Sequence, residues 1–179
     1  DSGASDLQDA DNTWRIEFKG VYHLQEASGN VSDTSGNAHT GTATGTNSIT
    51  GKIGKGRSFV LASSEKIDLG NLADWDFGEG DFTIAVWATQ GANGGRILLS
   101  RNGNTTYDPF LFGYNNNTND VLYMSSNGSS WDVANGVNMG TMTYDNATWY
   151  RMILVRIGNN FFTYQNGSQI ATFNIAATL

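Results

Sequence analysis

The chain contains no cysteine, only one proline and few charged side chains. Without cysteine it can form neither a disulfide nor a thiolate metal site, and catalysis by a thiol is excluded. Charged residues make up 15% of the 179 residues, so much of the polar surface must come from glycine, serine, threonine and asparagine. These residues separate short apolar runs, a pattern that is typical of strands joined by turns and not of helices.

Basic residues are scarce as well. Ten Lys and Arg are outnumbered by 17 Asp and Glu, which gives a formal net charge of −7. A negative surface repels phosphate backbones, so we expect no nucleic-acid partner. Carboxylate oxygens do suit divalent cations, Ca²⁺ first. The apolar runs are all too short to cross a bilayer, so membrane insertion is not expected either.

The length is that of one domain. Residues 1–13 are acidic and polar, and we interpret them as a linker or tail that precedes a domain over 14–179. Within that domain ten to twelve short strands are expected, and no stretch shows a convincing helical stripe of apolar residues. The expected strands cover 14–24 (as one or two), 58–69 (as two), 82–88, 96–100, 110–114, 121–126, 129–133, 149–157, 161–165 and 168–173.

Two of these segments allow sharper predictions. In FTIAVWA, residues 82–88, strict alternation places Phe82, Ile84 and Val86 on one face, which we expect to be buried, and Trp87 on the other. Asn166-Gly167 separates two alternating runs, which is the strongest short signal for a β-hairpin with a type I′ turn. Regularly spaced short strands of this kind predict a two-sheet sandwich or a barrel.

Five blocks of the sequence follow one another in a characteristic order: GVYHLQE (20–26), SDTSGNAHTGT (32–42), GKIGKGRSFV (51–60), IDLGNLADWDFGEGDFTIAVWA (67–88) and WYRMILVRIGNNFFTYQNGSQIA (149–171). In order and spacing these blocks resemble laminin-G-like domains, a branch of the concanavalin A-like lectin and glucanase superfamily found in bacterial extracellular multidomain proteins. The resemblance runs through residues 14–173. The motifs are individually weak, but their ordered combination is specific for the fold, and much less so for a ligand.

The resemblance implies an all-β, two-sheet antiparallel jelly-roll sandwich at the cell surface or outside the cell. It also implies neighbouring β domains in the same longer protein as partners. One departure concerns the end of the chain. Family members continue past the hairpin to a final strand with an acidic pair, whereas this sequence stops at Leu179. We therefore expect that the closing strands are missing here or are supplied otherwise, which would leave a family-type calcium site incomplete.

The long polar segment 27–51 is the expected metal site. It holds almost no large side chains, and a loop of that length inside a compact domain is usually functional or ordered by a metal. Glu26, Asp33 and Asn37 supply oxygen ligands of the kind that Ca²⁺ prefers. The alternative is that Asp and Asn hydrogen-bond the loop's own backbone in Asx turns.

A glycan site is expected where aromatic side chains lie in polar loops, because aromatic faces stack on sugar rings and amides, carboxylates and guanidinium groups bind hydroxyls. The alternative is that these aromatics belong to the core, as we expect for Trp14, Trp75, Trp87 and Trp149. The candidate ligand-binding residues are Trp131, Tyr123, Tyr114, Tyr107, Arg101, Asn115 and Asp120.

Catalytic signals are weak. Related glucanases carry their carboxylates as Glu-x-Asp-x-Glu on one strand, and this sequence has no such triplet. No Gly-x-Ser-x-Gly elbow is present either. The sequence therefore predicts a non-catalytic carbohydrate-binding or adhesion module whose partner is a polysaccharide or glycan. The alternatives are a structural or protein-interaction domain of a surface, filament or virion assembly, and a polysaccharide-cleaving enzyme of the same fold.

Overall fold

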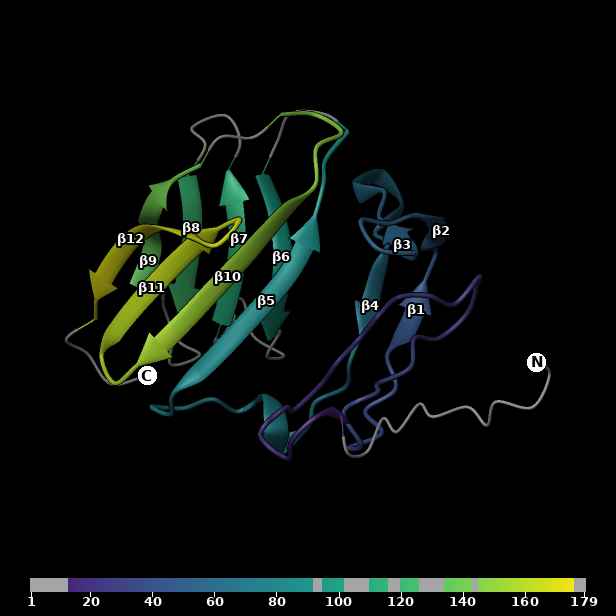
Figure 1. Cartoon of the computed structure of the whole chain (residues 1–179), viewed down its shortest axis with the longest axis horizontal. Coiled ribbons are helices and arrows are strands. Elements are labelled where there is room, and N and C mark those ends of the chain that lie inside the picture. Colours follow the sequence, from purple (N-terminus) through teal and green to yellow (C-terminus); the bar gives the residue numbers. More distant parts are fainter. Residues whose placement is uncertain are drawn as a thin grey trace, which may run out of the picture. The chain divides into compact units, whose positions relative to one another are not determined.

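The structure, a computed structural model, describes residues 13–91, 95–101, 110–115, 120–125, 134–142 and 145–175. The chain divides into two compact units, Asp1–Trp75 and Asp76–Leu179. Every pair of strands in both units is antiparallel, which confirms the prediction of an all-β chain (Figure 1). Among the described residues, no helix has the length and hydrophobicity that crossing a membrane requires.

The C-terminal unit consists of two four-stranded sheets, with the strand orders β12-β11-β10-β5 and β6-β7-β8-β9. The strands of the first sheet are β5 (Phe82–Ala88), β10 (Tyr150–Ile157), β11 (Asn160–Gln165) and β12 (Ser168–Asn174). Those of the second are β6 (Gly95–Arg101), β7 (Phe110–Asn115), β8 (Asp120–Ser125) and β9 (Ala134–Thr141). The sequence did not predict β9, and the strand expected over 129–133 lies outside the described residues.

Side chains from both sheets form one hydrophobic core. Phe112 on β7, Leu154 on β10 and Phe161 on β11 have no exposed surface. Phe82, Ile84 and Val86 are partly buried and pack against this core, while Thr83, Ala85 and Trp87 are exposed. This confirms the predicted face assignment of residues 82–88 and shows that the two sheets enclose a common interior.

The hairpin between β11 and β12 turns at Asn166 and Gly167, as the sequence predicts. Both residues have positive φ, 50° and 89°, which is what a type I′ turn requires. The Asn166 side chain also contacts β10, because its Oδ1 accepts a hydrogen bond from the Arg151 N–H at 2.9 Å. The turn is thereby attached to the start of β10.

The N-terminal unit contains two small sheets, β1 (Thr42–Thr44) with β4 (Lys66–Asp68), and β2 (Asn47–Thr50) with β3 (Lys55–Ser58). Two 3₁₀ turns, η1 (Leu61–Ser63) and η2 (Ala73–Trp75), complete it. β1 and β2 lie within the segment that was expected to be mainly loop.

The strand prediction for 14–24 is wrong. That segment contains only an isolated bridge, between Tyr22 and Asp33, and Leu24 has a positive φ of 57°. Its apolar side chains do not form a buried strand face: Ile16 is 81% exposed, and Phe18 packs edge-on against Trp14. Hydrogen bonds to the side chains of the following loop hold the segment in place.

Candidate functional site

Asp33 is the centre of the loop in which calcium was expected. Its side chain is fully buried, and both carboxylate oxygens accept hydrogen bonds from the chain. Oδ1 accepts from the Val21 and Ser35 N–H groups, each at 2.8 Å. Oδ2 accepts from the Ser35 hydroxyl at 2.8 Å and from the His39 N–H at 3.1 Å. Burial alone would raise the pKa of Asp33, but these four donors outweigh it and lower the pKa below its usual value.

The same loop orders its neighbours. The Tyr22 hydroxyl donates to the His39 carbonyl at 2.6 Å, and burial together with the charge of Asp33 raises the pKa of Tyr22 to about 12. His39 also packs edge-on against Trp75, with its Nε2 3.4 Å from the Asp74 carboxylate. Side-chain and backbone groups of residues far apart in sequence therefore fix this segment without a packed strand.

Glu26 and Asn37, the other two expected calcium ligands, lie in different settings. Glu26 Oε1 accepts from the Ser32 N–H at 2.8 Å, and its Oε2 is a buried oxygen with no hydrogen-bond partner. Burial would raise the pKa of Glu26, but this hydrogen bonding and the nearby Arg57 charge lower it. Asn37 donates its amide N–H to the Phe18 carbonyl at 2.8 Å.

As arranged here, these three residues do not fit a calcium ion. A cation needs oxygen lone pairs that point at it, and Ca²⁺ takes six to eight of them. The Asp33 oxygens already receive four donor protons, and the described residues contain no group of three or more acidic, His or Cys side chains placed to hold a metal. The geometry matches the Asx-turn alternative for Asp33, and calcium binding by the chain stays a prediction.

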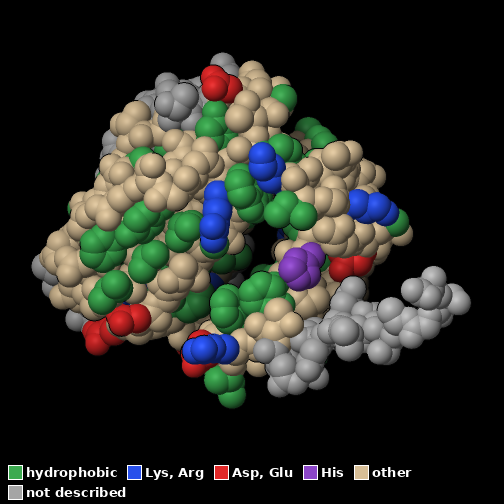
Figure 2. All heavy atoms as spheres, in the orientation of Figure 1, with side chains coloured by type: hydrophobic (Ala, Val, Ile, Leu, Met, Phe, Trp, Pro, Cys, Tyr) green, Lys and Arg blue, Asp and Glu red, His purple; other side chains and the backbone are tan. Residues whose placement is uncertain are grey.

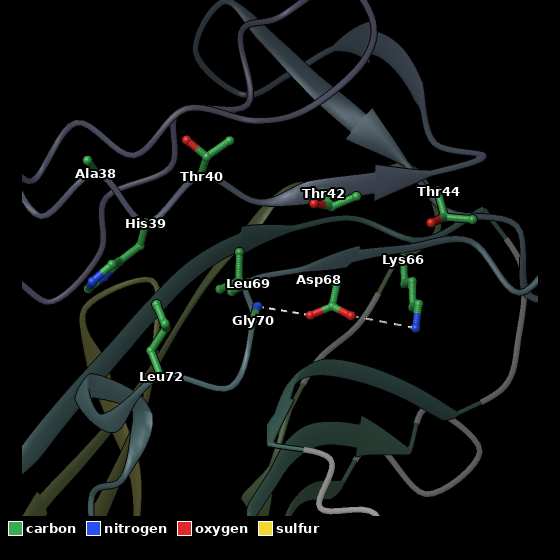
Figure 3. Close-up of a pocket in the computed structure, with 10 residues that line it drawn as sticks. All are labelled: Ala38, His39, Thr40, Thr42, Thr44, Lys66, Asp68, Leu69, Gly70 and Leu72. Atoms are coloured by element: carbon green, nitrogen blue, oxygen red, sulfur yellow. Dashed lines mark hydrogen bonds and ion pairs between the residues drawn. The ribbon is translucent and has the colours of Figure 1, made fainter.

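A hollow of about 750 Å³ with a mixed polar and apolar lining lies in the N-terminal unit (Figure 3). Thr42 and Thr44 on β1 line it next to their register partners Asp68 and Lys66 on β4. Asp68 accepts a hydrogen bond from the Gly70 N–H at 2.9 Å and is 3.9 Å from the Lys66 ammonium. These four side chains are exposed, and Ala38, Leu69 and Leu72 add apolar surface to the lining, so no buried, unpaired group of the described lining is directed into the hollow.

Two of the residues that were expected to bind a glycan have described side chains, Tyr114 and Arg101. Tyr114 is only 2% exposed, so the prediction that its ring is available to a sugar is wrong. β7 places Phe110, Phe112 and Tyr114 on the same face, which is the face that forms the core. Arg101 at the end of β6 pairs with the Asp76 carboxylate at 2.7 Å.

Of the remaining five predicted residues, the structure brings only Asn115 and Asp120 next to one another among the residues that it describes. Tyr107 and Trp131 lie outside the described residues. For Asn115, Asp120 and Tyr123 the structure describes the backbone alone: Asn115 and Asp120 are register partners at one end of the β7–β8 pair, and Tyr123 is paired with Phe112. Their part in a glycan site stays a prediction.

A different surface carries exposed aromatic residues, namely the outer face of the β12-β11-β10-β5 sheet, which we call the outer face. It is the side away from the core, and Figure 2 looks onto it, with hydrophobic side chains at the surface over β10 and β11 among polar ones. The residues that form it are Thr83, Ala85, Trp87, Arg151, Ile153, Val155, Ile157, Asn160, Phe162, Tyr164, Gln169, Thr172 and Asn174.

Strand register arranges the outer face in rows that cross the sheet. Trp87 lies opposite Arg151. In the next row Ala85, Ile153, Tyr164 and Gln169 follow one another from β5 to β12. A third row contains Thr83, Val155, Phe162 and Thr172. The middle of the face is therefore aliphatic and aromatic, and amides and hydroxyls surround it.

Sequence reasoning placed Trp87 on the correct face but assigned it to packing, although it is 39% exposed. The sequence did contain a signal for this exposed face: in 149–157 the alternation places Arg151 on the same side of the strand as Ile153, Val155 and Ile157. These residues could not be recognised as an exposed face until the pairing of β10 with β5 was known.

No family model, curated protein or solved structure matches this chain. The resemblance to laminin-G-like domains therefore stays a prediction from the sequence.

Proposed function

We propose that this chain is a non-catalytic carbohydrate-binding or adhesion module of a secreted or cell-surface protein, and that it binds a glycan on the outer face. The observation that carries the proposal is the set of Trp87, Tyr164 and Arg151 on one exposed side of one sheet, with Gln169 beside Tyr164. The two facing antiparallel sheets and the sequence resemblance support a laminin-G-like jelly roll as the framework.

The chemistry of the outer face suits sugars. Pyranose rings have apolar C–H faces that stack on aromatic side chains, and their hydroxyls need donors and acceptors close by. Trp87 is 39% exposed, and Gln169 donates to the Thr172 hydroxyl at 3.0 Å, which fixes its amide on the surface next to Tyr164. The face therefore combines stacking surfaces with oriented polar groups.

The size of the outer face favours a chain-like ligand over a globular partner. Four strands about 4.8 Å apart and roughly seven residues long, at ~3.3 Å per residue, give a face of about 400 Å². Two such faces packed together would bury about 800 Å², below the ~1,200 Å² of a standard stable protein interface. An extended polysaccharide needs only a strip of this size.

The test is binding of soluble polysaccharides, measured by affinity electrophoresis and confirmed by calorimetry. The wild type should bind at least one polysaccharide, and Trp87→Ala should weaken that binding about tenfold, because stacking on the ring is lost. Phe59→Ala is the matched control, since Phe59 is also an exposed aromatic, at 52%, but lies in the N-terminal unit. Absence of binding to every polysaccharide, or equal losses in both variants, would contradict the proposal.

A release assay separates a binding module from an enzyme of the same fold. Incubation of the chain with the bound polymer should produce no new reducing ends and no unsaturated products. Their appearance would identify the polysaccharide-cleaving alternative instead.

A further inference from the structure

We infer that the glycan is acidic, a uronate-bearing polysaccharide, and that Arg151 determines this specificity by binding the carboxylate of a sugar stacked on Trp87. The inference rests on the proposed function and adds to it the chemical class of the ligand. Its starting point is the single exposed charge on an otherwise uncharged sheet.

The strands β5, β10, β11 and β12 contain no Asp or Glu, and their charged residues are Arg151 and Arg156. Arg156 is 2% exposed and structural: its guanidinium donates to the carbonyls of Gly78 and Gly158 at 2.6 and 2.7 Å. Arg151 is exposed, and within the described part of the chain its guanidinium makes no ion pair or hydrogen bond.

The position of Arg151 is fixed by its backbone. Its N–H donates to Asn166 Oδ1 and its carbonyl accepts from the Asn166 N–H, both at 2.9 Å. On the other side it is the register partner of Trp87. Directly opposed side chains on neighbouring strands start about 5 Å apart, which is close to the width of one sugar ring. A ring on Trp87 would therefore bring a substituent within reach of the guanidinium.

Protection of a sheet edge does not explain this arginine. Natural sheets place charges on edge strands to prevent further pairing. β10 is an interior strand, hydrogen-bonded to β5 on one side and β11 on the other. A charge on such a strand protects no edge.

A carboxylate fits the guanidinium better than neutral hydroxyls do. Two parallel N–H donors match the two oxygens of a carboxylate, and such a charged pair is stronger than a neutral hydrogen bond. The amides and hydroxyls that surround the face could bind neutral hydroxyl groups by themselves, so a neutral ligand would need no cation.

Charge also selects among anionic polymers. The chain carries a net charge of −7, which opposes the approach of any polyanion, most of all a densely sulfated one. Two carboxylates in the loops that flank these strands accept hydrogen bonds within the chain: Asp81 from the Gly158 N–H at 2.7 Å, and Asp145 from the Tyr150 hydroxyl at 3.1 Å. One exposed arginine on an otherwise uncharged face matches one carboxylate, that of the sugar stacked on Trp87.

The experiment measures affinity for polygalacturonate, dextran sulfate and hydroxyethyl cellulose at low and physiological salt. The full chain is compared with Arg151→Gln, Arg151→Lys and Arg15→Gln. Arg15 is exposed in the N-terminal unit, so Arg15→Gln removes the same charge elsewhere. We expect polygalacturonate to bind best, and Arg151→Gln to weaken it about 10- to 100-fold, the range for one hydrogen-bonded ion pair. Arg151→Lys should recover part of the loss and Arg15→Gln should change little.

The outcomes separate the two proposals. Binding of hydroxyethyl cellulose as tightly as polygalacturonate, with Arg151→Gln without effect, would overturn the acidic specificity and leave glycan binding intact. Preference for dextran sulfate, or equal losses in Arg151→Gln and Arg15→Gln, would also overturn it. If no polymer binds and the chain instead dimerises through a contact that Trp87→Ala removes, the occupant of the face is a second copy and both proposals fail.

Discussion

Gly140 on β9 lies directly against Ala171 on β12, so that a Cβ atom at position 140 would come within 3.0 Å of the Ala171 Cβ. The two strands belong to different sheets, and β9 and β12 are edge strands in them. The Thr163 hydroxyl also donates to the Met139 carbonyl at this place. The sheets therefore approach one another closely at this edge because the residue there has no side chain.

Substitution of Gly140 should consequently destabilise the C-terminal unit. Its φ of 113° is unfavourable for any residue with a side chain, and the new methyl group would push against Ala171 and Ile170. We expect Gly140→Ala to lower the free energy of unfolding by about 1–3 kcal/mol in urea titrations. Gly91→Ala is the matched control, because its Cβ would meet nothing within 4 Å. Equal effects of the two substitutions would show that the close approach is unimportant.

The sequence predicted the C-terminal unit far better than the N-terminal one, for a physical reason. In residues 82–88 and 149–174, alternation, Asn-Gly and Gly-Asn turns and β-branched residues all indicate the same strands. In 14–24 a similar run of apolar residues is paired only at the isolated Tyr22–Asp33 bridge, and capping by the Asp33 carboxylate determines the backbone instead. Such capping depends on which residues meet in space, and periodicity carries no information about that.

The candidate site was predicted less well than the fold. An aromatic residue beside polar residues, such as Tyr114, gives the same local pattern in a core strand as on a surface. What decides is the pairing of the strand, and β7 is an interior strand with its aromatic side on the core. For Trp87 the predicted alternation was correct, but its exposure follows from which face of β5 packs on the core, and only the assembled sheets show that.

Phe82 should be one of the residues on which the stability of the C-terminal unit depends. Its ring stacks on Phe77 at 4.6 Å and lies edge-on to Phe110 and Phe161. Phe82→Ala should cost about 2–4 kcal/mol, since the residue is partly rather than completely buried. The neighbouring Thr83→Ala, on the exposed side of β5, should change stability by less than ~0.5 kcal/mol. A larger effect at Thr83 than at Phe82 would reverse the face assignment.

The Asn166-Gly167 turn offers a test of backbone conformation alone. Nothing lies within 4 Å of a Cβ at position 167, so a substitution there changes φ preference without a steric clash. With φ at 89°, Gly167→Val should destabilise the hairpin by about 1–2 kcal/mol, and Gly167→Asn by less, because asparagine tolerates positive φ. Chemical denaturation compares the two variants. Equal stability would mean that the turn contributes little to the fold.

Calcium should have little effect on thermal unfolding of this chain. Both oxygens of Asp33 already accept hydrogen bonds from the loop, so a cation would have to displace them. We expect the same Tm in EDTA and in millimolar CaCl₂. A rise of several degrees with Ca²⁺ that is lost in Asp33→Ala would instead establish the calcium site predicted from the sequence.

Asp33 should make the N-terminal unit sensitive to acid. Its pKa is lowered in the folded chain, whereas in the unfolded chain it takes the ordinary value of ~3.9. As the pH falls below ~4, the unfolded chain therefore binds the proton first and stability decreases. Above pH ~5 the contribution of Asp33 to the free energy of unfolding is complete and constant.

Asp33→Asn tests this effect. The variant keeps the size of the side chain but presents an amide N–H where one oxygen accepts two hydrogen bonds, so we expect the free energy of unfolding to fall by about 1–3 kcal/mol at pH 7. The difference in the free energy of unfolding between Asp33→Asn and the wild type should shrink towards pH 3. Urea unfolding followed by tryptophan fluorescence measures it. Asp68→Asn, at an exposed position, controls for the loss of one carboxylate. A difference that stays the same from pH 7 to pH 3 would show that the Asp33 charge does not hold the loop.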